Sequence, residues 1–262
     1  MNIKNEKLTL KTKDGAVIPC ELRYPDEPVA FVIVTHGFGS RKESPTAQMM
    51  LEELPKAGYG AIAYDLPAHG SSGAENEALS LALCVEYMKT VEEYIISEHI
   101  FPRICYFSSS FGAYINLTYL SRECHTGDKS FLRSAAVNMP ELFDVSNDPE
   151  ALRTLREQGS IMVEEGGPAP VKVPAEFIKE LSANDLFKII PEPYYSEEKF
   201  IGLELMMIHG EKDMVIDPEK AELFADKKNI PIEILPEEDH TLSTDPETPL
   251  KVARKAIDFY CE

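Results

Sequence analysis

The chain has 262 residues, of which 44% are hydrophobic, and this is ample for one large domain with a buried core. Its 26 Lys and Arg residues against 45 Asp and Glu residues give a formal charge of −19, which repels phosphate backbones and anionic lipid surfaces. We therefore expect neither nucleic acid nor a membrane as a partner. The N-terminal stretch lacks the apolar segment of a signal peptide, and no run approaches the ~18 to 20 apolar residues of a membrane span, so a cytoplasmic protein is expected.

The predicted elements begin with an antiparallel hairpin. Residues 8–12 and 17–24 flank the pair Asp14-Gly15, which favours the positive φ angles of a tight turn. The apolar, β-branched run at 29–37 is typical of a strand covered on both faces of a mostly parallel sheet. Similar short runs predict further strands at 60–65, 103–108, 134–139, 203–210 and 230–237.

Helical patterns separate these strands. Ser44 and Pro45 suit the cap and first turn of a helix that runs to about Lys56. From Glu75 to about Glu98, apolar residues recur at three- and four-residue steps. The other predicted helices span 111–120, 218–229 and 246–260. The pattern predicts an α/β fold: a mostly parallel sheet with an N-terminal antiparallel hairpin and helices on both faces.

The alternation of strands and helices fails between residues 140 and 201, where only one helix, at 148–159, is indicated. A stretch this long is more than a plain connection. We therefore divide the chain into a core, 1–139 with 202–262, and an insertion, 140–201. The insertion is expected to form a cap or lid over an active site. Alternatively, the insertion is a peripheral segment or forms a dimer contact. A homodimer is therefore a possible assembly.

Three consecutive serines lie where the strand at 103–108 gives way to a helix. A nucleophile elbow of the G-x-S-x-G type needs small residues two positions before and after its serine, so that the backbones can pass. Ser110 meets this condition, with Ser108 in place of the usual glycine and Gly112 after it. Ser109 and Ser108 each have a large aromatic residue at one or both of these positions.

A nucleophilic serine needs a general base and a carboxylate that orients the base, and in this architecture they follow in the order Ser, Asp or Glu, His. Asp213 and His240 lie in loops just past the last two predicted strands, which should open on the same sheet edge as Ser110. Asp217, more simply a helix cap, and Asp144 are the alternatives to Asp213. The other histidines are more simply interpreted as loop or surface residues: His36, His69, His99, His125 and His209.

Five motifs, "THGFGS", "YDLPAHGSS", "SSSFGA", "HGEKDMVIDP" and "EDHTLS", resemble in this order the α/β-hydrolase superfamily, across essentially the whole chain. Within it, the sequence resembles bacterial esterases of the cinnamoyl and feruloyl type and the related serine aminopeptidase-like hydrolases. The resemblance implies Ser110 as nucleophile, Asp213 as acid and His240 as base. An oxyanion hole needs two backbone N–H donors, which we expect from Phe111, just after the nucleophile, and, by similarity to the H-G-x loop of such hydrolases, from Phe38.

The sequence therefore predicts a serine hydrolase that cleaves a carboxylic ester through an acyl-enzyme, with a small acyl or aryl ester of a cinnamoyl- or feruloyl-like kind as substrate. Aromatic residues of the insertion, Phe143, Phe177, Tyr194 and Tyr195, are candidates to contact such a group, or else they pack the insertion onto the sheet. No metal or organic cofactor is expected. The sequence has no H-E-x-x-H, no Walker glycine loop, and five cysteines without a C-x-x-C pair.

Two other functions stay open. An aminopeptidase or amidase would use the same three residues and would need carboxylates to bind a substrate amine, for which Glu141 with Glu164 or Glu165 is a candidate supply. A hydrolase-fold binding protein without turnover is the third hypothesis, and the intact set of serine, aspartate and histidine argues against it.

Overall fold

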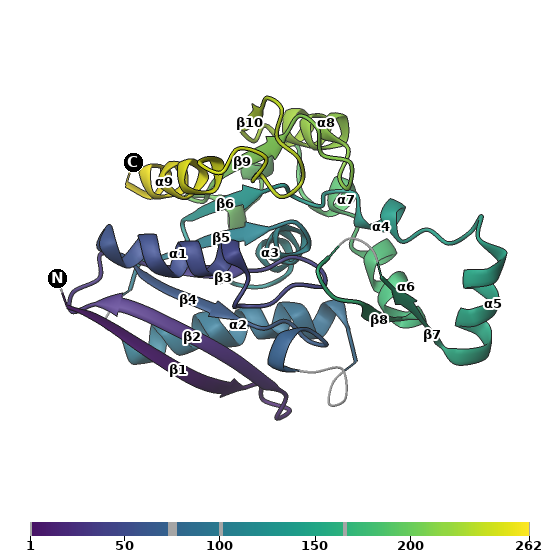
Figure 1. The fold of residues 1–262 in the computed structure, drawn as a ribbon, viewed down its shortest axis with the longest axis horizontal. Coiled ribbons are helices and arrows are strands. Elements are labelled where there is room, and N and C mark those ends of the chain that lie inside the picture. The colour runs from purple at the N-terminus through teal and green to yellow at the C-terminus, as the bar shows by residue number, and fades with distance from the viewer. Residues whose placement is uncertain (1, 73–77, 100–101, 165–166, 262) are drawn as a thin grey trace.

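The computed structural model describes residues 2–72, 78–99, 102–164 and 167–261, and an eight-stranded sheet forms its centre (Figure 1). The strands are β1 (Ile3–Lys11), β2 (Val17–Pro25), β3 (Phe31–Thr35), β4 (Gly60–Tyr64), β5 (Ile104–Ser109), β6 (Lys129–Arg133), β9 (Glu204–Gly210) and β10 (Ile232–Leu235). Their order across the sheet is β1-β2-β4-β3-β5-β6-β9-β10. Strand β2 pairs antiparallel with β1 and β4, and the other neighbouring pairs are parallel. The predicted α/β fold with its N-terminal hairpin is confirmed.

Helices cover both faces of the sheet. On one face lie α1 (Pro45–Lys56) and α9 (Thr248–Cys261); on the other lie α2 (Leu81–Glu98), α3 (Phe111–Arg122) and α8 (Pro218–Lys228). Each group packs its apolar side chains into its own buried cluster against the strands. Among the helices in the described ranges, none combines the length and the apolar character that crossing a bilayer requires.

Side-chain caps determine where the first two helices begin. Ser44 Oγ accepts a hydrogen bond from Ala47 N, with Pro45 as the first residue of α1, as predicted. Ser80 caps α2 by accepting from Leu83 N, so this helix begins later than the sequence pattern indicated. The predicted start, Glu75, lies outside the described residues.

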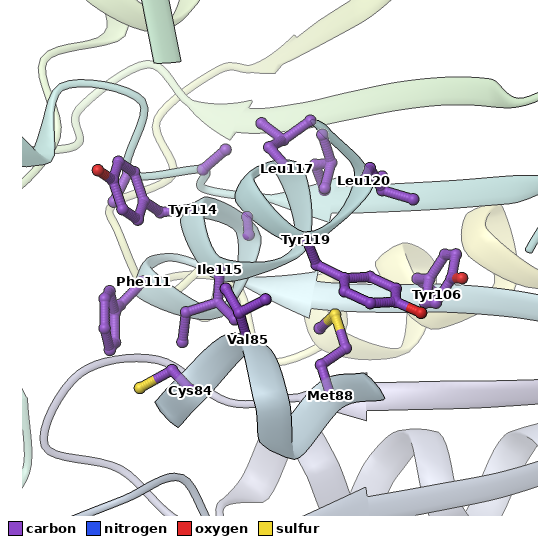
Figure 2. Packing of buried hydrophobic residues seen from close by; sticks show 14 of the residues in the cluster. Cys84, Val85, Met88, Tyr106, Phe111, Tyr114, Ile115, Leu117, Tyr119 and Leu120 are labelled. Carbon is purple, nitrogen blue, oxygen red and sulfur yellow. The ribbon is translucent and has the colours of Figure 1, made fainter. Parts of the chain in front are cut away.

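Helix α3 is buried along residues 111–121. Figure 2 shows its side chains, among them Ile115 and Tyr119, in a cluster that also contains Val85 and Met88 of α2. A helix that is apolar all round has to be covered on all sides to be stable. Its N-terminus, which follows Ser110, the last of the three consecutive serines, is therefore held by the packing of the whole core.

The strand predicted at 134–139 is wrong. Strand β6 is Lys129–Arg133, and residues 134–139 form a buried connection to α4 (Met139–Leu142). Ser134 has φ 46°, a conformation that ends an extended strand. The true strand escaped detection because it begins and ends with charged residues, both of which are nevertheless buried.

The insertion, residues 140–201, contains more regular structure than the one helix that the sequence indicated. After α4 it forms α5 (Pro149–Gln158), β7 (Ser160–Val163), β8 (Val171–Pro174), α6 (Ala175–Ala183), α7 (Leu186–Ile189), and the short 3-10 helices η2 (Tyr194–Ser196) and η3 (Glu198–Phe200). Strands β7 and β8 pair antiparallel in a sheet of their own. Figure 1 shows α5 and this hairpin extending to one side of the central sheet.

The insertion is docked on the core by both apolar and polar contacts. Phe177 and Leu181 of α6 belong to the same buried cluster as α2 and α3. Glu180 accepts hydrogen bonds from Ser80 Oγ at 3.0 Å and from Leu81 N at 2.6 Å, so the insertion contributes a cap to α2. Tyr114 of α3 donates to the carbonyl of Leu181. The insertion thus shares a hydrophobic core with the central sheet, and contacts with this core contribute to the stability of the insertion.

Truncating Phe177 tests this shared core. Phe177 is fully buried, and Phe177→Ala should lower the free energy of unfolding by about 3 to 5 kcal/mol, because it removes buried apolar surface and leaves a cavity. Urea unfolding followed by circular dichroism measures the change. Ile201→Ala, at a side chain that is 72% exposed, is the matched control and should cost less than about 0.5 kcal/mol. A loss below about 1 kcal/mol for Phe177→Ala would show that the insertion packs independently of the core.

Candidate active site

The candidate residues lie in loops at the carboxyl edge of the parallel strands. Ser110 follows β5, Asp213 follows β9 and His240 follows β10. In an open sheet, the carboxyl ends of parallel strands meet at one edge, where ligands bind. The strand order therefore brings three residues that are far apart in the chain to one edge of the sheet.

Ser110 occupies a sharp turn between β5 and α3. Its backbone has φ 52° and ψ −117°, a rare and strained conformation for a residue with a side chain. The turn is pinned by Ser110 N, which donates to the carbonyl of Arg133 at 2.9 Å. A Cβ at Gly112 would lie 2.5 Å from the carbonyl oxygen of His36, so a small residue is required two positions after the serine.

The three side chains form a continuous hydrogen-bonded chain. Nε2 of His240 lies 3.0 Å from Ser110 Oγ, and Nδ1 of His240 lies 2.7 Å from Asp213 Oδ2. Because the carboxylate can only accept, Nδ1 carries the proton, and Nε2 is left as the acceptor for the serine hydroxyl. This is the tautomer that a general base needs.

Asp213 is held as a charged carboxylate. Its side chain is fully buried, which by itself would raise its pKa, but hydrogen bonds from His209 and His240 and from the loop amides outweigh burial and hold the pKa well below its ordinary value. Oδ1 accepts from Val215 N at 2.9 Å and from Ile216 N at 2.8 Å. These bonds leave Oδ2 oriented toward His240.

His209, which the sequence indicates only as a loop residue, is a second partner of this carboxylate. Its Nε2 lies 3.0 Å from Asp213 Oδ2 and 3.1 Å from the carbonyl of Ile216. Both neighbours are acceptors, so Nε2 carries a proton and donates. His209 is completely buried, and its hydrogen bond helps to orient Asp213. The signal in the sequence was weak, since it was only a histidine before a glycine at a strand end.

His36 orients the loop that carries Phe38. Its Nδ1 donates to the carbonyl of Gly37 at 2.8 Å, and its Nε2 accepts from Leu66 N at 3.1 Å. Burial, with a smaller effect of nearby His69, lowers the pKa of His36 to about 3, so the ring is neutral and this pattern is kept. Because the peptide unit is planar and trans, anchoring the Gly37 carbonyl turns the N–H of Phe38 to the other side. Phe111, as the first residue of α3, has an amide without an acceptor in its helix.

Four phenylalanine rings join these two loops to the insertion. Phe38 and Phe111 lie 5.8 Å apart between ring centroids; Phe143 lies 5.5 Å from Phe38, and Phe177 lies 5.8 Å from both Phe111 and Phe143. The backbone of the insertion also approaches the loop of Phe38. A Cβ at Gly39 would lie 2.5 Å from the carbonyl oxygen of Ala169. Two of the four insertion residues predicted to contact a substrate, Phe143 and Phe177, are therefore packed on the residues expected to supply the oxyanion hole.

Tyr194 and Tyr195 are placed elsewhere, and the prediction that they contact a substrate is not supported by their positions. Tyr194 donates to the carbonyl of Leu203, just before β9, and Tyr195 accepts from Asn229 at the end of α8. Both contacts lie at the amino edge of the parallel strands, opposite the edge that carries Ser110. These tyrosines pack the end of the insertion onto the core.

The remaining predicted alternatives have other partners. Asp217 caps α8 by accepting from Glu219 N, and Asp144 is exposed and accepts from Ser146 N. Glu141 is paired with Lys220 at 3.0 Å, and Glu164 is exposed. Glu165 lies outside the described residues.

A cavity of about 520 Å³ lies between β10 and α9, but the three candidate residues do not line it. Its charged groups pair with one another, as Lys255 does with Glu233 and Lys251 with Asp245. Within the described part of the chain, no group of three or more His, Cys, Asp or Glu side chains is arranged to hold a metal ion. The hydrogen-bonded chain from Ser110 to Asp213 is therefore the candidate site.

Comparison with known proteins agrees with the fold. The family model described as serine aminopeptidase, S33, a hydrolase family, matches residues 26–163, just over half of the chain. The chain belongs to this family of α/β hydrolases. No curated protein sequence matches it.

Solved structures of similar fold cover almost the whole chain. A protein from Agrobacterium vitis S4 superposes with a TM-score of 0.80 at 18% identity, covering 98% of this chain and 99% of that one. Est1E from Butyrivibrio proteoclasticus, solved with ferulic acid bound, gives 0.78 at 18% identity, with coverage of 97% and 100%. A thermostable carboxyl esterase from Bacillus coagulans, in complex with glycerol, gives 0.72 at 16% identity, with coverage of 99% and 98%. At these identities the likeness establishes the fold, and esterases are among the structures that share it.

The low pKa of Asp213 predicts a pH-dependent contribution to stability. A carboxyl group with a lowered pKa in the folded state stabilises that state above its unfolded pKa, about 4, and loses the contribution as the pH falls toward its folded pKa. The difference in free energy of unfolding between wild type and Asp213→Asn should therefore shrink as the pH is lowered from about 5 to about 2. Urea unfolding at a series of pH values measures it, with Asp226→Asn, at an exposed position of α8, as the control for loss of one charge. A difference that stays constant over this range would contradict the prediction.

Proposed function

We propose that the protein is a serine esterase in which Ser110 is the nucleophile, His240 the general base and Asp213 the acid that orients it. The observation that carries the proposal is the chain of contacts at 3.0 and 2.7 Å through the correct tautomer of His240, with Ser110 on a strained turn. A serine that only packs the core would not need the positive φ angle or a histidine paired with a buried carboxylate.

In the proposed reaction, His240 Nε2 takes the hydroxyl proton as Ser110 Oγ attacks the ester carbonyl carbon. The N–H groups of Phe38 and Phe111 hold the oxyanion, and each lowers the barrier by on the order of 3 kcal/mol. His240 then gives its proton to the leaving oxygen, which departs as the alcohol. Water attacks the acyl-enzyme with His240 again as base, which releases the acid and restores Ser110. Asp213 keeps the imidazole in one tautomer and stabilises its charged form.

A small acyl or aryl ester, cinnamoyl- or feruloyl-like, is the proposed substrate class. Support comes from the aromatic rings beside the site, Phe38, Phe143 and Phe177, and from the fold shared with Est1E, which was solved with ferulic acid. The insertion, packed against the loop of Phe38, is proposed to act as a cap that limits the size of the group accepted.

An aminopeptidase is the second candidate, favoured by the description of the matching family. The carboxylates suggested for binding a substrate amine give it less support, because Glu141 is paired with Lys220. The two functions differ in the leaving group and can be separated by substrate choice.

Covalent labelling tests the mechanism. A fluorophosphonate probe should label the wild-type protein and should fail to label Ser110→Ala, because the probe traps an activated serine. Ser109→Ala is the matched control: Ser109 is the neighbouring buried serine, its Oγ has no hydrogen-bond partner among the described residues, and the variant should still be labelled. Full labelling of Ser110→Ala, or none of the wild type, would refute the mechanism.

A substrate panel tests the reaction class. The wild type should hydrolyse the p-nitrophenyl esters of acetate, butyrate and octanoate, and also methyl ferulate. In Ser110→Ala the esterase activity should fall at least about 1,000-fold. Aminoacyl p-nitroanilides are measured in parallel. Rapid turnover of the anilides with none of the esters would replace the esterase proposal by the aminopeptidase one.

A further inference from the structure

The end of β6 lies between the nucleophile and the loop that carries His240. The carbonyl of Arg133 accepts from Ser110 N at 2.9 Å. The next residue, Ser134, donates from its Oγ to the carbonyl of His240 at 2.9 Å. The guanidinium of Arg133 donates to the carbonyl of Thr241. Two consecutive residues thus bond to both the nucleophile turn and the backbone of the base.

Burying these two polar side chains costs free energy, because they lose their hydrogen bonds to water. Ser134 is fully buried and Arg133 is 7% exposed. Buried charges are normally paired with an opposite charge, whereas the hydrogen bond of this guanidinium goes to a backbone carbonyl. Burial lowers the pKa of Arg133 to about 10, while the fields of Asp213, Asp239 and Glu238 raise it, so the group is still a cation at neutral pH. A buried cation is used here to hold a single backbone carbonyl.

The backbone conformation at Ser134 serves the same contacts. Its φ of 46° turns the chain out of β6, and its N–H donates to the carbonyl of Ile208 at 2.8 Å, which ties the turn to β9. The loop of His240 is also tied to the loop of Asp213, since Lys212 N donates to the carbonyl of Glu238 at 2.8 Å. The base is therefore held on one side by the acid loop and on the other by residues 133–134.

We propose that Arg133 and Ser134 are positioning residues that hold the imidazole of His240 at hydrogen-bond distance from Ser110. This inference rests on the proposed serine hydrolase function. Neither side chain touches the reacting atoms; both act through the backbone of residues 240–241. A displacement of about 1 Å at a reacting group can reduce the rate about 100-fold, so two bonds that fix this backbone have a direct effect on the chemical step.

Removing the Ser134 hydroxyl is the first test. In Ser134→Gly the backbone can keep its positive φ angle, and only the hydrogen bond to His240 is lost. We expect kcat for the best ester of the panel to fall about 10- to 100-fold, with KM within about twofold, because substrate contacts are unchanged. Ser130→Ala is the matched control. It removes a buried hydroxyl of β6, four residues earlier in the chain, which donates to Asn116 away from the site, and kcat should stay within about twofold.

A proton NMR signal separates this inference from the proposed function. The proton between His240 Nδ1 and Asp213 Oδ2, which are 2.7 Å apart, should give a strongly deshielded resonance, to be assigned by its loss in Asp213→Asn. In Ser134→Gly this resonance should shift or broaden, and in Ser130→Ala it should match the wild type. The measurement needs no turnover, so it decides the inference even where the wild type cleaves no ester.

Arg133 supplies the second pair of variants. Arg133→Lys keeps a donor for the carbonyl of Thr241, whereas Arg133→Met has no donor there. Arg133→Lys should therefore retain more activity than Arg133→Met when circular dichroism shows that both variants are folded to the same extent. If Ser134→Gly folds and keeps the wild-type kcat and resonance, or if the two Arg133 variants fold and are equally active, the positioning role is overturned. If Arg133→Met does not fold, Ser134→Gly alone decides.

Discussion

A single backbone conformation organises the site: Ser110 is held at φ 52°, where a residue with a side chain is strained. The strain persists because the residues on both sides leave no alternative. Strand β5 is paired on both edges, and α3 is buried along residues 111–121, so the chain must reverse direction within one residue. The close approach of Gly112 to the carbonyl of His36 then brings the loop of Phe38 against the same turn. The packing of the core therefore holds the Ser110 hydroxyl in one position.

The base and its acid depend on this turn but are stabilised by polar contacts. Asp213 is buried with four hydrogen-bonding neighbours, which keep it charged and fix its orientation. A buried carboxylate with fewer donors would take up a proton and could no longer orient His240. His209 therefore has a defined part in the site, although its side-chain hydrogen bonds go to Asp213 and Ile216 and not to Ser110.

The insertion contacts the site through aromatic packing. Phe143 and Phe177 contact the rings of Phe38 and Phe111, whose N–H groups are proposed to bind the oxyanion. Any rearrangement of the insertion that admits a larger acyl group must therefore be accommodated beside these donors. Under the proposed function, substrate selection and transition-state stabilisation would both depend on these four packed residues, Phe38, Phe111, Phe143 and Phe177.

The sequence by itself determined the α/β fold and singled out Ser110, Asp213 and His240 as the candidate residues, because strand and helix periodicity and the order of loop motifs are local properties. It did not determine β6, whose charged ends, Lys129 and Arg133, are buried only by contacts with distant segments. For the same reason it could not separate Phe177 from Tyr195: both are aromatic residues of the insertion, and only tertiary packing places one beside the elbow and the other at the far edge of the sheet. The roles of His209, Arg133 and Ser134 likewise depend on contacts between loops, which no local pattern encodes.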